Sequence, residues 1–198
     1  MKRIFAVLFL AIALVSPALA EDMNLELIPK IGYLFSPEVT QKIDTTNSHS
    51  KDSTISIGAD LFFDMQNNLF LGFGLMWGQN HKFNSASNNK IGFTNIYGAL
   101  KYKFLVNDSQ NEPLFLYPLI QLGFGVPGWE YIGYQQDYVI EGRVYWGIGV
   151  GGEYKNVILE FIYGCNYAAE KYVLANRDIE NDLTYTAFRI TAGYKFEL

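Results

Sequence analysis

The 198-residue sequence contains little cysteine, little histidine and no excess of positive charge, and each shortage excludes a class of protein. Cys165 is the single cysteine, which excludes an intramolecular disulfide and a metal site built from a cysteine cluster. The formal net charge of −5 argues against a nucleic-acid-binding protein that works by neutralising phosphates. With 49% hydrophobic residues, the chain also lacks the composition of a disordered protein. We expect neither a metal nor a cofactor.

Beyond residue 20 the sequence has no apolar stretch long enough for a transmembrane helix. Met1–Ala20 begins with two basic residues, continues with apolar Ile4–Val15 and ends in the small-residue sequence Ala18-Leu19-Ala20. This pattern is typical of a secretory signal peptide. An N-terminal membrane anchor is the alternative, and the apolar run is short for a span of about 20 residues. We therefore predict a signal peptide over residues 1–20 and one domain over residues 21–198.

Apolar residues recur at every second position through most of the remaining chain, which is the pattern of β-strands. No segment shows a convincing helical period, so the predicted class is all-β. Eight strands are predicted: Asn24–Ser36, Thr54–Met65, Leu69–Gly78, Phe93–Phe104, Leu114–Val126, Val139–Tyr154, Val157–Ala168 and Leu183–Leu198.

The two faces of each predicted strand differ in chemistry. One face is apolar, and the other carries every strand charge together with glycines such as Gly72, Gly74, Gly149 and Gly151. A soluble barrel or sandwich would turn the apolar face inward, whereas a membrane barrel turns it toward lipid. The narrow lumen of an eight-stranded barrel favours small residues, so the glycines favour the membrane barrel. A soluble periplasmic barrel with a ligand in an apolar core is the alternative.

The predicted connections also favour a membrane barrel. Those after the second, fourth and sixth strands are short, and those after the first, third, fifth and seventh are longer. The longer ones are Pro37–Ser53, Gln79–Gly92, Pro127–Tyr138 and Ala169–Asp182. Short turns at one end and long loops at the other are typical of outer-membrane barrels, whose long loops face the cell exterior. An even number of strands then places both termini in the periplasm.

The C-terminal segment Thr191–Leu198 resembles the end signal of bacterial outer-membrane barrels, a polar residue and a glycine followed by alternating apolar residues. Its matching positions are Gly193, Phe196 and Leu198, although Leu198 stands where the family usually has Phe or Trp. The chain from residue 21 onward resembles the small eight-stranded barrels that include the transmembrane domain of OmpA, OmpX and the opacity-type surface proteins. The resemblance implies recognition by the barrel-assembly machinery, and roles in adhesion, resistance to host factors or envelope integrity.

The candidate site residues in the barrel are charged residues on the polar face. We predict that they form a salt-bridge network that fills the lumen, because eight strands leave just enough space for side chains. Glu141 and Arg143 are expected near the outer rim, and Lys30, Asp60 and Arg189 deeper. A path for protons or ions is the alternative. The full predicted network is Lys30, Asp60, Lys101, Glu141, Arg143, Glu153, Glu160 and Arg189.

The predicted loops hold the remaining candidates. Trp129, Tyr131 and Tyr134 are expected to contact an external protein or glycan or to pack on the barrel rim, since aromatics are enriched at interfaces. Lys82 and Lys90 lie in a loop for which two interpretations stay open, a flexible solvated loop and a contact with anionic lipopolysaccharide. His49 and His81 match no catalytic motif, and we interpret them as solvated loop residues.

These features predict a non-enzymatic outer-membrane protein whose lumen is plugged and whose four loops face the exterior. The expected partners are outer-membrane lipid, including lipopolysaccharide, the assembly machinery and an external protein or glycan, with no nucleic acid. Two alternatives stay open: a lipid-modifying outer-membrane enzyme and a narrow channel for small solutes.

Overall fold

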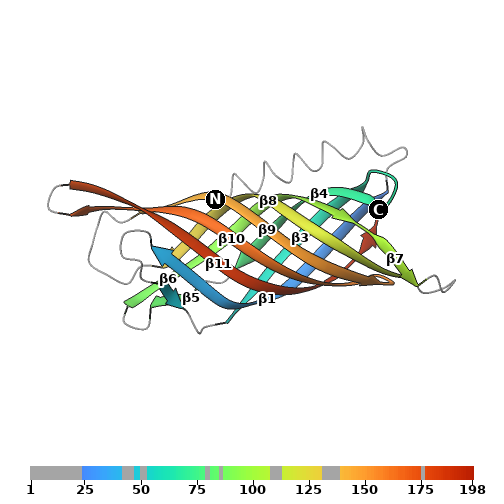
Figure 1. The fold of residues 1–198 in the computed structure, drawn as a ribbon, viewed down its shortest axis with the longest axis horizontal. Coiled ribbons are helices and arrows are strands. Elements are labelled where there is room, and N and C mark those ends of the chain that lie inside the picture. Colours follow the sequence, from blue (N-terminus) through green and yellow to red (C-terminus); the bar gives the residue numbers. More distant parts are fainter. Residues whose placement is uncertain are drawn as a thin grey trace.

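The computed structural model describes residues 24–41, 47–49, 53–78, 81–84, 87–107, 113–130, 139–174 and 177–198. Within them the regular elements are β-strands (Figure 1). The eight long strands are β1 (Leu25–Gln41), β3 (Thr54–Asp64), β4 (Leu69–Gly78), β6 (Ser87–Tyr102), β8 (Leu114–Glu130), β9 (Val139–Tyr154), β10 (Val157–Leu174) and β11 (Arg177–Tyr194). Four are short: β2 (Asn47–His49), β5 (His81–Asn84), β7 (Phe104–Asn107) and β12 (Phe196–Glu197). None of the described residues forms a helix that is long and apolar enough to cross a membrane.

The eight long strands form a closed antiparallel ring. Each pairs with the next long strand along the chain, and β11 returns to pair with β1. That closing seam extends from Lys30↔Gly193 to Gln41↔Leu183. Because every long strand has two neighbours, none of them presents a free edge, as expected of an up-and-down barrel. The predicted fold class, an all-β eight-stranded antiparallel barrel, is confirmed.

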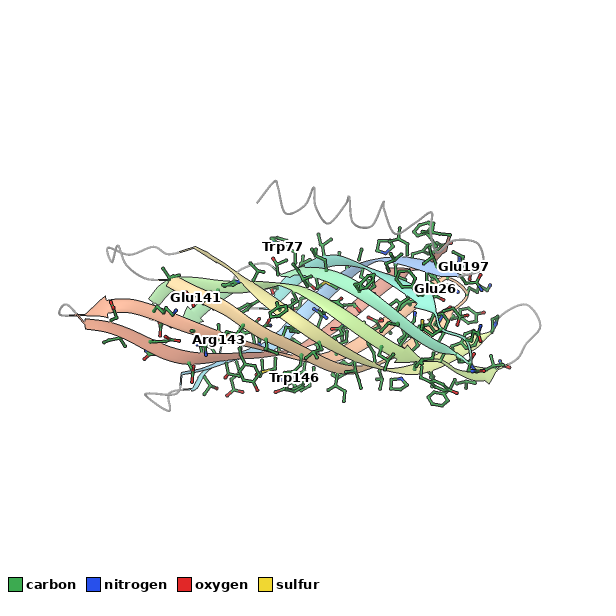
Figure 2. All side chains as sticks on the ribbon, turned by 90° about the horizontal axis from the view of Figure 1, so that it is seen from above. Glu26, Trp77, Glu141, Arg143, Trp146 and Glu197 are labelled. Atoms are coloured by element: carbon green, nitrogen blue, oxygen red, sulfur yellow. The ribbon has the colours of Figure 1, made fainter. Side chains whose placement is uncertain are left out.

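Large apolar side chains cover the outside of the ring. Leu122 is 64% exposed and Phe124 is 67% exposed, whereas Lys30 is 4% exposed and Asp60 is 1% exposed. Aromatic side chains near the strand ends are exposed as well, among them Phe104 and the outward-pointing Trp77 (Figure 2). A soluble protein would have the opposite arrangement, with its charges outside. The structure therefore confirms the prediction of apolar residues outward and a polar lumen.

Glycines make room for the side chains that fill the lumen. A Cβ atom at Gly74 would overlap the Asp60 carboxylate and the Tyr97 ring, and one at Gly151 would overlap the Tyr117 ring. Gly98 points outward, and the atom nearest to a Cβ placed there is 3.8 Å away. The lumen is thus too crowded for even a methyl group at these inward positions.

The two ends of the barrel differ in construction. At one end, the short-turn end, the connections over residues 65–68 and 155–156 join neighbouring strands tightly, and Lys155 adopts a left-handed φ of 56°. At the other, the hairpin end, β10 and β11 stay paired as far as Leu174↔Arg177 and project well beyond the ring (Figure 1). The two ends therefore differ, and in the described residues the difference is the projecting hairpin.

Several strands are longer than predicted, all at the hairpin end. β1 continues to Gln41, β8 to Glu130 and β10 to Leu174, so that the predicted loop over residues 169–182 is a hairpin rather than an irregular loop. Backbone pairing does not require an apolar outer face once the strand leaves the lipid. The period-two pattern consequently ends before the strand does.

Candidate functional site

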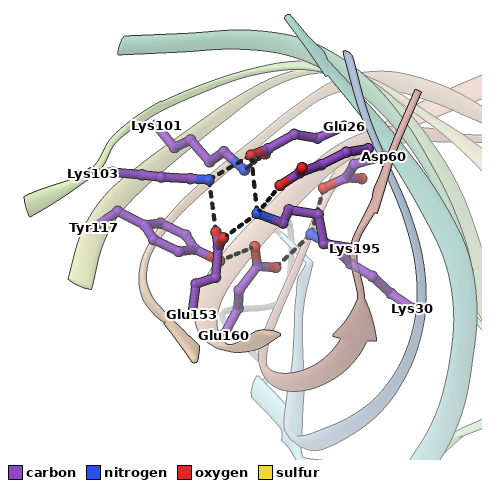
Figure 3. Close-up of polar contacts among 10 residues, drawn as sticks. Glu26, Lys30, Asp60, Lys101, Lys103, Tyr117, Glu153, Glu160 and Lys195 are labelled. Atoms are coloured by element: carbon purple, nitrogen blue, oxygen red, sulfur yellow. Dashed lines mark hydrogen bonds and ion pairs between the residues drawn. The ribbon is translucent and has the colours of Figure 1, made fainter. Parts of the chain in front are cut away.

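The lumen near the short-turn end is filled by alternating lysines and glutamates. Glu26 accepts hydrogen bonds from Lys101 at 2.7 Å and from Lys103 at 2.6 Å (Figure 3). Glu153 lies 2.7 Å from Lys103 and 2.7 Å from Lys195. These side chains come from β1, β6 and β9 and from the β6–β7 and β11–β12 junctions, and all are at least nine-tenths buried. Each ammonium group therefore has a carboxylate partner, which a buried charge requires.

The ammonium group of Lys30 lies between two carboxylates in the lumen. It donates to the carboxylate of Asp60 and, at 2.7 Å, to that of Glu160. The same two carboxylates accept hydrogen bonds from tyrosines. The Tyr97 hydroxyl lies 2.8 Å from Asp60. The Tyr117 hydroxyl lies 3.0 Å from Glu160 (Figure 3). We call the whole set the lysine network: Glu26, Lys30, Asp60, Lys101, Lys103, Glu153, Glu160 and Lys195.

Aromatic rings fill the space between the charges. The Lys101 ammonium lies 4.0 Å from the centre of the Phe62 ring, and the Lys103 ammonium lies 4.2 Å from that of Phe70. Cations over aromatic faces are stabilised by the ring quadrupole, more strongly where water is excluded. The rings thus fill space between the charged side chains of the network.

Arg189 is buried in the lumen outside the lysine network. Its guanidinium group donates to Gln121 Oε1 at 3.2 Å and approaches the Tyr145 hydroxyl at 3.5 Å. The Tyr145 hydroxyl in turn donates to Gln121 at 2.6 Å. Within the described residues no carboxylate lies within ion-pair distance of Arg189.

A cluster of apolar side chains closes the lumen at the hairpin end. We call it the hairpin-end cluster: Val39, Ile91, Phe93, Ala168, Leu183, Tyr185 and Ala187, with Leu34 and Ile140 packed against it. Phe93 and Tyr185 lie ring to ring, with centroids 5.2 Å apart. A cavity of about 30 Å³ lies between this cluster and Arg189. The lumen is thus filled by two chemically distinct layers.

Six of the eight residues predicted for the lumen network lie in the lumen. Lys30, Asp60, Lys101, Glu153, Glu160 and Arg189 are all buried. The prediction omitted three members of the lysine network, Glu26, Lys103 and Lys195. It also omitted Gln121 and Thr191, which bind Arg189 and Glu160. All five occupy inward positions of predicted strands, so the strand phase could have identified them.

The prediction that Glu141 and Arg143 point into the lumen is wrong. Tyr145 pairs with Asn166 and Gly142 pairs with Ala168, so that two residues, Arg143 and Val144, oppose the single Tyr167. The extra residue is a β-bulge, and a bulge reverses the inside–outside phase of the strand beyond it. Glu141 and Arg143 therefore lie on the outer face of the hairpin end.

On that face they form ion pairs with the projecting hairpin. Arg143 lies 2.5 Å from Glu180 and 2.9 Å from Asp182, and Lys171 lies 2.7 Å from Glu141. These side chains are about half exposed. The hydrogen bond from Lys171 to Glu141 stabilises the ammonium form and raises the pKa of Lys171 above its ordinary value. We call these five residues the charged hairpin face: Glu141, Arg143, Lys171, Glu180 and Asp182.

The predicted loop contacts lie largely outside the described residues. Tyr131 and Tyr134 are not described, and the side chains of Lys82, Lys90 and Trp129 are not described either. The same holds for the side chains of His49 and His81, whose backbones lie in β2 and β5. The predicted signal peptide over residues 1–20 is also outside the described part of the chain.

The residues of the predicted end signal lie at the ring's seam. Phe196 pairs with Leu27 through β12, and the Leu198 backbone N–H donates to the Leu25 carbonyl at 3.0 Å. Gly193 pairs with Lys30. Phe196 and Leu198 both point outward and are exposed. The C-terminal segment thus completes the seam at the short-turn end.

Comparison with known families decides what kind of barrel this is. A family model described as "Outer membrane protein beta-barrel domain" matches residues 5–196. The chain belongs to this family. As an outer-membrane barrel, it has lipid against its apolar outer surface, which accounts for the exposed belt of large hydrophobic side chains. No curated protein matches the sequence at a significant level.

Several solved outer-membrane proteins have a similar arrangement of strands. Ail of Yersinia pestis, solved with the heparin analogue sucrose octasulfate, is 14% identical; the match covers 87% of this chain and 99% of that one, with a TM-score of 0.49. AlkL, solved in lipid bilayers, is 14% identical over 89% of this chain and 90% of its own, with a TM-score of 0.48. Neisserial surface protein A is 14% identical; the match covers 89% of this chain and 100% of that one, with a TM-score of 0.43.

Proposed function

We propose that this outer-membrane barrel is a plugged, non-enzymatic anchor that displays its hairpin end outside the cell for contact with an external protein or glycan. The observation that carries the proposal is that the lumen is filled. The lysine network occupies one half, and the hairpin-end cluster occupies the other. A barrel filled in this way serves as a rigid support rather than as a passage.

The surface that the barrel supports is the charged hairpin face. It is held on three neighbouring strands, β9, β10 and β11, by ion pairs between half-exposed side chains. Mixed charge of this kind favours a polar partner with complementary groups, because electrostatic complementarity gives specificity and orientation. The short-turn end and both strand termini of the ring then face the periplasm.

Removing the hairpin tests this role. Glu170 and Asn181 lie directly opposite each other, so Lys171–Glu180 can be replaced by the two-residue turn Asn-Gly without changing the ring. We expect the shortened protein to keep the heat-dependent gel shift of a folded barrel and to lose adhesion of whole cells to immobilised host protein or glycan. Undiminished adhesion of the shortened protein would contradict the proposed role of the hairpin.

Two further measurements separate the proposal from its alternatives. In planar bilayers the purified protein should show no conductance steps under conditions in which a porin conducts. Stepwise conductance would instead support a narrow channel. Mass spectrometry of lipid A from cells with and without the protein should show the same acyl pattern, and a changed pattern would support a lipid-modifying enzyme.

A further inference from the structure

We infer that the barrel encloses a binding site for one small inorganic anion, of the size of chloride, between Arg189 and the hairpin-end cluster. The site is the cavity of about 30 Å³ described above. Its lining includes the polar side chains of Thr54, Ser56, Asn95, Asn166 and Arg189, together with Tyr145 and Tyr185. It lies apart from the proposed surface of the hairpin, so the inference does not depend on the proposed function.

The first argument is that Arg189 has no carboxylate in contact. Each lysine of the lysine network has a carboxylate within 2.8 Å, and each carboxylate of that network has a lysine. The remaining buried carboxylate among the described residues, Glu170, lies beside Asn181 in the hairpin. The Arg189 guanidinium group donates to the neutral groups of Gln121 and Tyr145, and an arginine cannot lose its proton instead. A buried charge with no counter-charge in contact is costly, so the surroundings of Arg189 favour a bound anion.

The second argument is the set of unused hydrogen-bonding groups. Arg189 Nε, Ser56 Oγ and Thr54 Oγ1 are buried and have no partner among the described residues. All three carry a hydrogen and can donate it. The side-chain oxygens of Asn95 and Asn166 are also unpartnered there, and each amide can turn to present its N–H₂ group instead. Buried polar groups are otherwise almost always satisfied.

The third argument is the shape of the cavity. Gly125 leaves room for Asn166, because a Cβ there would overlap the Asn166 oxygen. A volume of about 30 Å³ accommodates about two water molecules, or one halide-sized ion with little to spare. Two waters would satisfy the donors, but they would leave the guanidinium group without a counter-charge in contact, so the observations favour an anion.

The direct test is to crystallise the protein refolded in sodium bromide and to locate bromide by its anomalous scattering. We expect one peak within hydrogen-bond distance of Arg189 Nε and of the Ser56 or Thr54 hydroxyl. Refolding from urea in the chosen salt gives the ion access to the cavity before the ring closes. Ordered waters in the cavity with no bromide peak would overturn the inference.

A stability measurement gives an independent answer. The urea midpoint of the native protein should rise with chloride concentration relative to gluconate at equal ionic strength, because a ligand that binds only the folded state stabilises it. The unfolding equilibrium constant should fall about tenfold per tenfold increase in chloride once the site is near saturation. Equal midpoints in chloride and gluconate would overturn the inference.

Variants separate the site from general salt effects. Arg189→Met should abolish the chloride dependence, and the double variant Thr54→Val/Ser56→Ala should weaken it while keeping the charge. Arg143→Gln, which removes an exposed arginine from the outer face, should respond to chloride as the native protein does. If Arg189→Met does not fold, the double variant decides the question, and an unchanged chloride dependence in it would contradict the site.

Discussion

Lys30 is the side chain on which the centre of the lumen depends most. Its ammonium group lies between Asp60 and Glu160, and these carboxylates also hold the hydroxyl groups of Tyr97 and Tyr117. Removing one partner from a buried ion pair is far more costly than replacing the whole set, because the remaining charge stays buried and unpaired. A single substitution at Lys30 should therefore lower the free energy of unfolding more than a combined substitution that removes Lys30 and both carboxylates.

We predict that Lys30→Met lowers the free energy of unfolding by about 3–5 kcal/mol, the range for breaking a buried ion pair. Urea titration in lipid vesicles, followed by tryptophan fluorescence, measures this change. The triple variant Lys30→Met/Asp60→Asn/Glu160→Gln removes all three charges and should recover most of the loss. A triple variant as unstable as the single one would show that packing, not charge, is responsible.

Glycine positions in the ring offer a second residue-scale prediction. Gly74→Ala places a methyl group against Asp60 and Tyr97, and we expect it to cost about 1–3 kcal/mol of unfolding free energy, as overpacking does. Gly98→Ala is the matched control on the outer face, where the nearest atom is 3.8 Å away. It should leave stability unchanged or raise it by up to about 1 kcal/mol, because alanine restricts the unfolded chain. Equal urea midpoints for the two variants would contradict this account of the lumen.

At the scale of elements, the bulge in β9 decides which face the charged residues occupy. The two residues Arg143 and Val144 oppose Tyr167, and beyond them Glu141 lies on the outer face beside Lys171. Charged side chains are suited to this position because the strand has left the lipid. The bulge thus marks the change from membrane-facing to water-facing sheet.

The Lys171–Glu141 pair gives a pH-dependent prediction for this element. The raised pKa of Lys171 means that the pair's attraction is fully present below the ordinary lysine pKa and is lost as pH rises through the raised value. Glu141→Gln removes the carboxylate, so the pKa of Lys171 should fall toward its ordinary value. An NMR titration of the Lys171 side chain measures this, with Glu197→Gln at the opposite end as the control. An unaltered pKa in Glu141→Gln would refute the pairing.

The strands could be predicted because lipid and lumen impose opposite chemistry on alternate residues. That condition holds from Leu69 to Gly78 in β4, where the predicted and observed bounds coincide. It fails in β9 between Arg143 and the hairpin end, because the bulge adds one residue to the strand. The alternation of apolar and polar residues in the sequence gives no sign of that extra residue. It also fails over residues 169–182, where backbone pairing continues although the outer face is charged.

The partners within the lumen could not be predicted in the same way. Lys101 and Glu26 are 75 positions apart in the sequence and meet only because of how the strands are staggered around the ring. Strand phase shows that both side chains point inward, but it does not give their relative height. Arg189 illustrates the consequence, because its inward direction was predictable and its lack of a carboxylate partner was not.

At the scale of the whole molecule, the ring closes where its first and last strands meet. β11 forms most of this seam, and β12 completes it at the short-turn end by pairing Phe196 with Leu27 and Glu197 with Glu26. Glu26 also accepts hydrogen bonds from Lys101 and Lys103 inside the lumen. The last residues of the chain therefore hold in place a strand that carries part of the lysine network.

We predict that removing Phe196–Leu198 impairs closure of the ring more than it lowers the stability of the closed ring. The truncation removes two residue pairs and the hydrogen bond from Leu198 to Leu25, while β11 keeps its pairing with β1. In cells, the truncated chain should accumulate without the heat-dependent gel shift. After refolding into vesicles, it should form the shifted species more slowly than the native chain, with a similar final yield.

Leu198→Phe is the matched variant for this prediction. It keeps the backbone hydrogen bond and presents the aromatic residue that similar barrels usually carry at this position, so assembly in cells should be at least as fast as for the native chain. Slow assembly of the truncated chain in cells, with normal refolding in vesicles, would assign the segment to recognition by the assembly machinery. Slow formation in both settings would assign it to the seam itself, and unchanged rates in both would contradict the prediction.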